Sequence, residues 1–182
     1  MVQSIKLYQD IIDKIAKSKC KSSESIQQLL RNYIGENLMQ NSRSLNDLHP
    51  KVKAMAEKFI ASCKKEGIDI LVTSTYRDAE SQNELYAQGR TKPGARVTNA
   101  KAGQSWHNYK LAFDIVPLRN GKPVWNTSGS IDVKLWARIG VLGKLAGLQW
   151  AGDWTGSLKE MAHFQYTGGL TLTDLQAGKQ LK

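Results

Sequence analysis

Residues 105–117 have the sequence SWHNYKLAFDIVP. The apolar, partly β-branched run from Leu111 to Leu118 predicts a strand. Asp114 lies in the middle of this run, between apolar neighbours. A carboxylate in such surroundings is costly to bury unless it is paired with a cation or bound to a metal ion. The sequence therefore predicts a positively charged partner for Asp114.

Two of the three histidines could share a site with this aspartate. His107 precedes Asp114 by seven residues, so it can lie at the mouth of the strand from which Asp114 projects. A hydrolytic zinc ion needs about three imidazole or carboxylate ligands and one position open for water. His107, Asp114 and His163 would supply that set. On spacing alone, ordinary hydrogen-bonded polar residues remain the commoner interpretation.

Two further charged residues have side chains suited to acid–base chemistry and anion binding beside a metal ion. Glu160 lies three residues before His163, close enough to share the site without being a ligand. A carboxylate beside a metal-bound water can accept its proton and pass it to the leaving amine. Arg77 is expected at the end of a strand and offers donors for a substrate carboxylate or a developing oxyanion. A purely structural ion pair is the alternative for Arg77.

The rest of the pattern predicts an α+β fold around a mostly antiparallel sheet, because helices and strands do not alternate regularly as βαβ units. Residues 90–105 lack any period and form a long loop, which in a compact domain is usually functional. Helices are expected from Pro50 to Gly67, over residues 79–88 and over residues 133–146. Strands are expected over residues 68–74, 111–118, 148–150 and 161–166.

The chain is expected to contain two parts. Residues 1–44 form an N-terminal helical extension, and residues 45–182 form the catalytic domain. The extension is too short to be stable alone, so a pair of helices docked on the catalytic domain is expected. A basic amphipathic element that contacts the cell envelope is the alternative, since the segment has seven Lys or Arg against four Asp or Glu.

Composition narrows the possible partners. Apolar residues make up 41% and charged residues 23%, which is typical of a soluble globular protein. The net charge of +10 favours a polyanionic partner such as nucleic acid or an anionic envelope surface. The basic residues are scattered and no nucleic-acid-binding motif is found, so we expect no nucleic-acid partner. The two cysteines form no CxxC pair, and no disulfide framework is indicated.

The N-terminus is interrupted by charges too often to form a signal-peptide core, and no apolar stretch approaches the ~20 residues of a membrane span. We therefore expect synthesis in the cytoplasm without stable membrane insertion. A monomer is also expected.

The motif SxHx6D with Ala112 inside it, followed by Glu-x-x-His, resembles that of a zinc peptidase family. The family includes VanY-type D-Ala-D-Ala carboxypeptidases and L-alanyl-D-glutamate endopeptidases. Over residues 45–168 the chain is similar to the endopeptidase branch, which includes bacteriophage endolysins. The stretches that carry this similarity are TSTYRDAESQNELYAQGRTKPG, VTNAKAGQSWHNYKLAFDIVP and GLQWAGDW.

The resemblance implies the fold shared by lysostaphin-type enzymes, D-Ala-D-Ala peptidases and hedgehog domains. It implies a single catalytic zinc ion on His107, Asp114 and His163. It further implies that Glu160 is the catalytic acid/base and that Arg77 orients the substrate.

The resemblance also leads to expectations for three other residues. Ser105 opens the first motif and is expected to bind substrate. Asp153, in AGDW, is a candidate for a substrate contact or for a supporting position beside the site. Lys110 is a departure, because the family pattern usually has glycine there, which puts the local backbone geometry or the charge of the pocket in question.

The implied function is hydrolysis of the L-alanyl-D-glutamate bond in the stem peptides of bacterial peptidoglycan. A D-Ala-D-Ala carboxypeptidase acting on the same stems is one alternative. A zinc-containing wall-binding module without activity is the other. If the source is a phage, the protein would accumulate in the host cytoplasm and act in the periplasm or on the cell wall after release.

Overall fold

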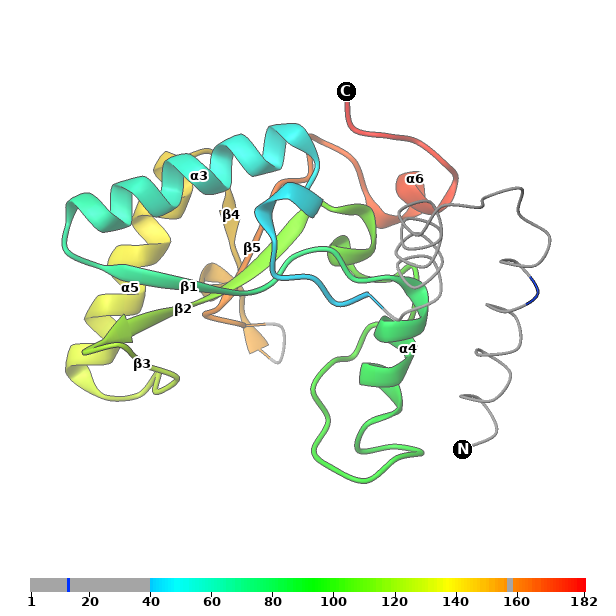
Figure 1. The fold of residues 1–182 in the computed structure, drawn as a ribbon, viewed down its shortest axis with the longest axis horizontal. Helices are drawn as coiled ribbons and strands as arrows, with labels where there is room; N and C mark the ends of the chain where they lie inside the picture. The colour runs from blue at the N-terminus through cyan, green and yellow to red at the C-terminus, as the bar shows by residue number, and fades with distance from the viewer. Residues whose placement is uncertain (1–12, 14–39, 157–158) are drawn as a thin grey trace. The chain divides into compact units, whose positions relative to one another are not determined.

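The computed structural model of the chain describes residue 13, residues 40–156 and residues 159–182 (Figure 1). Residues Gln40–Lys182 form one compact unit. The helices expected before residue 40 lie outside the described residues, so the division into an extension and a catalytic domain stays a prediction. Within the described ranges, no helix combines the length and apolar character that a membrane crossing requires.

An antiparallel sheet forms the centre of this unit. In the described part of the chain its strands have the order β1-β2-β5-β4, and β3 pairs with β2. This arrangement confirms the predicted α+β fold around an antiparallel sheet. The strands are β1 (Asp69–Ser74), β2 (Ala112–Arg119), β3 (Lys122–Pro123), β4 (Gln149–Trp150) and β5 (His163–Gln165).

The helices begin and end close to the predicted positions. His49 precedes the first turn of α3 and accepts a hydrogen bond from the backbone N–H of Lys51 through Nδ1 (3.3 Å). One short helix, α6, was not predicted, although Thr171 and Asp174 form a capping box at its start. The helices are α3 (Pro50–Lys65), α4 (Ala79–Ala87), α5 (Ser130–Leu145) and α6 (Leu172–Gln176), with 3₁₀ turns η1 (Leu45–Asp47), η2 (Trp106–Tyr109) and η3 (Ala151–Asp153).

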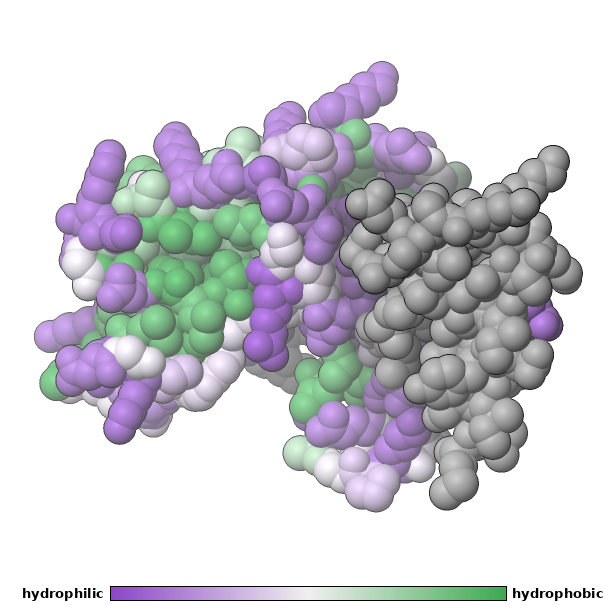
Figure 2. Space-filling view, in the orientation of Figure 1, coloured by the Kyte–Doolittle hydropathy of each residue, from purple (hydrophilic) through white to green (hydrophobic). Residues whose placement is uncertain are grey.

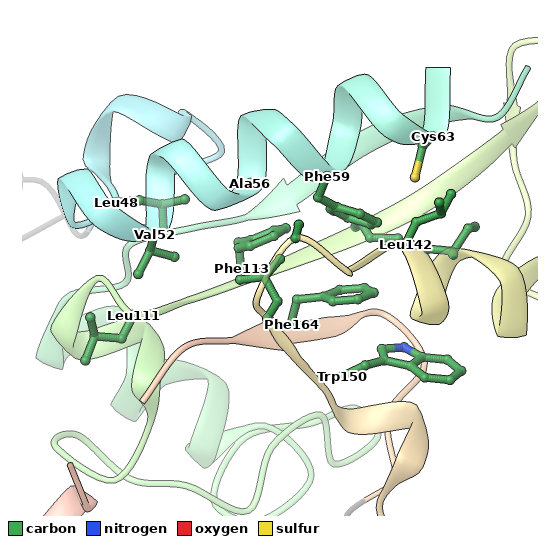
Figure 3. Close-up of a cluster of buried hydrophobic side chains, with 14 of the residues drawn as sticks. Leu48, Val52, Ala56, Phe59, Cys63, Leu111, Phe113, Leu142, Trp150 and Phe164 are labelled. Atoms are coloured by element: carbon green, nitrogen blue, oxygen red, sulfur yellow. The ribbon is translucent and has the colours of Figure 1, made fainter. Parts of the chain in front are cut away.

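Helices α3 and α5 bury one face of the sheet. The Phe59 ring of α3 lies 4.8 Å from the Phe164 ring of β5 and 6.2 Å from the Phe113 ring of β2, measured between centroids (Figure 3). Helix α5 approaches the same phenylalanine so closely that a Cβ at Gly143 would lie 2.3 Å from Phe164 Cε1. Hydrophilic residues cover the outer surface of α3, as expected for a helix with one buried side (Figure 2).

The register of β2 and β5 places polar side chains on the opposite face of the sheet. Phe113 pairs with Phe164, and Asp114 pairs with His163. Successive residues of a strand point to opposite faces, so the two phenylalanines enter the core while Asp114 and His163 point away from it. The sheet thereby carries a polar pair on the face that α3 and α5 leave open.

Candidate active site

Three side chains from separate parts of the chain bring their donor atoms together. His107 Nε2 lies 3.2 Å from Asp114 Oδ1, and His163 Nδ1 lies 3.0 Å from the same oxygen. The two histidine nitrogens are 3.3 Å apart. Both imidazoles are buried, and Asp114 is half-buried. This group is a candidate metal site, since its ligand atoms all lie within 4.8 Å of one another.

The local backbone explains how His107 reaches the strands. It lies on η2, and the residue that follows this turn, Lys110, has a left-handed conformation with φ of 63°. That conformation favours glycine, the residue that the resemblance leads us to expect at this position. The chain therefore keeps the glycine-type backbone with a lysine in it. The Lys110 ammonium lies over the ring of Tyr76, 4.9 Å from its centroid.

Hydrogen bonds fix the proton of each imidazole on the side away from Asp114. His107 Nδ1 lies 2.6 Å from the carbonyl oxygen of Thr75, which can only accept, so Nδ1 carries the hydrogen. Gln165 Nε2 donates to Gln149 Oε1 (3.0 Å), which leaves Gln165 Oε1 to accept from His163 Nε2–H (3.1 Å). Both inward nitrogens therefore present lone pairs.

The donor set fits a zinc ion. When both imidazoles are neutral, two lone pairs and one carboxylate oxygen meet, which is a repulsive arrangement unless a cation or a proton lies there. Two histidines and one carboxylate are a common ligand set of hydrolytic zinc, with a further position for water. His107, Asp114 and His163 are thus the residues that would hold the ion.

The pKa shifts show how strongly the three groups interact. Burial alone would raise the pKa of Asp114, but the charges and hydrogen bonds of His107 and His163 outweigh it and hold that pKa well below its usual range. Burial opposes a charge on His163, yet the hydrogen bond and charge of Asp114 raise its pKa. A cation is favoured at this position, either as a proton or as a metal ion.

The site opens into a cleft of about 760 Å³ whose lining includes all three donor residues together with Arg77, Ser105 and Glu160. The Glu160 side chain is exposed overall. Desolvation of its carboxyl group, and next the charge of Asp114, raise the pKa of Glu160. A carboxyl group with a raised pKa in the same cleft as the ligand set suits proton transfer.

Arg77 is buried and largely engaged. Its Nη1 donates to Gln82 Oε1 (3.0 Å), and its Nη2 donates to Ser74 Oγ (2.9 Å). Asp114 Oδ2 lies 3.9 Å from Nη2. Arg77 Nε is buried and has no partner among the described residues. Arg77 therefore keeps an unused donor in a side chain that lines the cleft.

Asp153 lies apart from this group. Its carboxylate accepts a hydrogen bond from Lys144 Nζ (2.6 Å), and both side chains are about half exposed. The cleft lining, over the described residues, does not include it. Ser105, in contrast, borders the cleft just before η2, and its side chain makes no capping hydrogen bond to the turn.

Sequence reasoning missed the residues that orient the ligands. Gln165 could have been found, because it lies two residues after His163 on the same face of the predicted strand. The Thr75 carbonyl could not have been found, because every residue has a backbone carbonyl and the residue type does not indicate which one accepts a hydrogen bond. Gln82 is fully buried yet polar, and nothing in its sequence context indicates the contact with Arg77.

Sequence comparison identifies the family. The profile of the VanY family, described as D-alanyl-D-alanine carboxypeptidase, matches residues 45–142. The chain belongs to the VanY family of peptidases. It is 36% identical over 137 residues to the peptidoglycan L-alanyl-D-glutamate endopeptidase CwlK of Bacillus subtilis, a match that covers 71% of this chain and 80% of CwlK. It is 31% identical over 132 residues to the L-alanyl-D-glutamate peptidase of a Listeria phage, covering 69% of this chain and 41% of that protein.

Solved structures show the same fold. The L-Ala D-Glu endopeptidase ChiX of Serratia marcescens superposes with a TM-score of 0.53 at 22% identity, covering 73% of this VanY-family chain and 92% of ChiX. A zinc-bound variant of the vancomycin resistance D,D-pentapeptidase VanY gives a TM-score of 0.51 at 17% identity, covering 79% and 86% of the two chains. The predicted zinc-peptidase fold is thereby confirmed.

Proposed function

We propose that this protein is a zinc peptidase that hydrolyses the L-alanyl-D-glutamate bond of peptidoglycan stem peptides. The observation that carries the proposal is the convergence of His107 Nε2, Asp114 Oδ1 and His163 Nδ1 in a cleft that also contains Glu160 and Arg77. The choice of bond is supported by the identity to CwlK and to the phage peptidase.

Each residue has a role that its surroundings support. A zinc ion held by His107, Asp114 and His163 would supply a Lewis acid and a water of lowered pKa. Glu160 accepts the proton of the attacking water and returns it to the leaving amine. Arg77, whose side chain lines the cleft, orients a carboxylate or carbonyl oxygen of the stem peptide through its guanidinium. Ser105 contacts the bound peptide from the rim of the cleft.

Analysis of muropeptides by mass spectrometry tests this proposal. Zinc-loaded protein is incubated with purified peptidoglycan fragments that carry complete stem peptides. The expected products are a glycan fragment ending in L-alanine and a free peptide beginning with D-glutamate. Protein with Glu160→Gln should leave the same substrate intact. Intact stems after prolonged incubation with the zinc-loaded wild-type protein would overturn the proposal.

A D-Ala-D-Ala carboxypeptidase is the second candidate, because the matching family profile carries that description. The same spectra separate the two activities. Loss of a single terminal alanine, with the bond between L-alanine and D-glutamate intact, would identify the carboxypeptidase. A fragment that begins with D-glutamate identifies the endopeptidase.

We also infer that the protein acts on the bacterial cell wall as an endolysin. The similarity to the Listeria phage peptidase supports this, and a net charge of +10 suits an anionic envelope surface. Expression in bacteria with and without a membrane-permeabilising agent tests it. Lysis is expected only when both the protein and the membrane lesion are present, and intact cells under both conditions would contradict an endolysin.

A further inference from the structure

Residues 40–42 lie antiparallel to the segment that follows β1 and carries Arg77. This segment precedes residues 45–142, which the family profile matches. Asn41 and Arg77 form an antiparallel β-bridge. The backbone hydrogen bonds join Ser42 N to Tyr76 O (2.8 Å), Thr75 N to Ser42 O (2.7 Å) and Asp78 N to Gln40 O (2.9 Å).

The side chain of Asn41 connects this segment to the guanidinium of Arg77. Ser74 Oγ donates its hydrogen to Asn41 Oδ1 (3.1 Å). A hydroxyl has one hydrogen, so once that hydrogen points at Asn41 the oxygen lone pairs are directed elsewhere. Arg77 Nη2 donates to this same oxygen (2.9 Å). The orientation of the serine hydroxyl, and with it the acceptor for Arg77, therefore depends on Asn41.

The contact matters because, besides Ser74, Arg77 is held by a hydrogen bond to Gln82 and by an ion pair of 3.9 Å with Asp114. Gln82 holds Nη1, Ser74 holds Nη2, and Nε has no partner among the residues that the structure describes. Loss of the serine acceptor would free one side of the guanidinium to rotate. A misplacement of about 1 Å in a group that positions substrate can cost on the order of 100-fold in rate.

We infer that Asn41 is a positioning residue for Arg77, acting through the hydroxyl of Ser74. Residues 40–42 are thus part of the peptidase site, although they lie outside the family match. The inference rests on the proposed function, in which Arg77 binds the stem peptide. Asn41 also lines the cleft, so a direct contact of its amide N–H groups with substrate is the competing explanation.

Substitution of Asn41 in the full-length chain separates these explanations. Asn41→Ala removes the acceptor for Ser74, and Asn41→Asp keeps an acceptor oxygen but has no amide donor. Asn46→Ala is a matched control, because Asn46 lies in the same region and its side chain, among the described residues, accepts a hydrogen bond from Lys53 Nζ (2.8 Å). Rates of stem-peptide cleavage, zinc content and melting temperature are measured for each protein.

The expected results are specific to positioning. Asn41→Ala should raise KM about tenfold with little change in kcat, because substrate orientation is lost while the metal ligands are untouched. Asn41→Asp and Asn46→Ala should behave like wild type. Ser74→Ala should match Asn41→Ala, and the double variant should be no worse than either single one, since both act along one path. Zinc content and melting temperature should stay at the wild-type values.

Three outcomes would overturn the inference. One is an unchanged KM in Asn41→Ala while the wild-type protein is active. Another is an Asn41→Asp protein as impaired as Asn41→Ala, which would identify the amide donors as the active feature. A third is additive loss in the double variant. A wild-type protein that cleaves no stem peptide would instead overturn the proposed function itself, and the inference with it.

Discussion

Asp114 and His163 lie directly opposite each other in the antiparallel pairing of β2 with β5, and His163 Nδ1 is 3.0 Å from Asp114 Oδ1. The same register places Phe113 opposite Phe164 in the core. A slip of one residue would turn the polar pair into the core and the phenylalanines into the cleft. Burial of the two aromatic rings therefore fixes the geometry of two of the three proposed metal ligands.

Replacement of Glu160 tests the proposed proton transfer. Glu160→Gln keeps the shape of the side chain but removes its ability to accept a proton, so the cleavage rate should fall by roughly 10²–10⁴-fold. Zinc content should stay at the wild-type value, because Glu160 is not among the three converging ligands. Glu57→Gln, on the exposed side of α3, is the control. A Glu160→Gln protein with wild-type rates would remove Glu160 from the mechanism.

The pH dependence of zinc binding follows from His163. Its pKa is raised, so in the metal-free protein the charged imidazole stabilises the fold below its unfolded pKa of about 6.5. This contribution is lost as pH rises through the higher folded pKa. Zinc requires the neutral imidazole, so its affinity rises over the same range. The difference in melting temperature between zinc-loaded and zinc-free protein should therefore grow from pH 5.5 to pH 8. A constant difference would contradict this coupling.

The steric cost of the left-handed backbone at Lys110 can be tested by comparing the stability of two substitutions. Lys110→Gly and Lys110→Ala both remove the ammonium from the ring of Tyr76. Only glycine adopts a φ of 63° without steric cost, which is about 1–2 kcal/mol for other residues. The glycine variant should therefore unfold at higher denaturant concentration than the alanine variant. Equal midpoints would show that this turn carries no strain.

Gly143 in α5 should tolerate no side chain. In an ordinary helix, glycine to alanine stabilises by about 1 kcal/mol. Here the added Cβ would lie 2.3 Å from Phe164 Cε1, and overpacking costs about 1–3 kcal/mol. We expect Gly143→Ala to lower the free energy of unfolding, as measured by chemical denaturation. Increased stability would mean that α5 can move away from β5 at little cost.

Much of the fold follows from local sequence signals. The strand over 68–74 and the helix after Pro50 were predicted within a residue or two of β1 and α3, because apolar periodicity and end signals agree there. Helix α5 begins at Ser130, three residues before the predicted start, since Gly129 ends the preceding loop without a capping side chain. The two-residue strand β3 is too short to produce a periodic pattern, and it is not predicted from the sequence.

The candidate residues of the site could be named from the sequence, but their geometry could not. His107, Asp114 and His163 were selected by type and family motif, and the structure brings them together. The orienting contact of His107 with the Thr75 carbonyl depends on long-range pairing that a sequence pattern does not contain, whereas the contact of His163 with Gln165 joins residues two apart on one strand. The surroundings of Asp153 could not be foreseen either, since its pairing with Lys144 depends on where the end of α5 meets η3.

X-ray absorption spectroscopy of the zinc-loaded protein, combined with metal analysis, tests the proposed centre most directly. The account predicts one zinc ion per chain with two imidazole nitrogens and carboxylate oxygen at about 2.0–2.2 Å, and an open position filled by water. In His107→Ala and His163→Ala proteins the ion should be lost or bound far more weakly. Full zinc occupancy with an unchanged spectrum in both variants would place the metal elsewhere and contradict the proposed site.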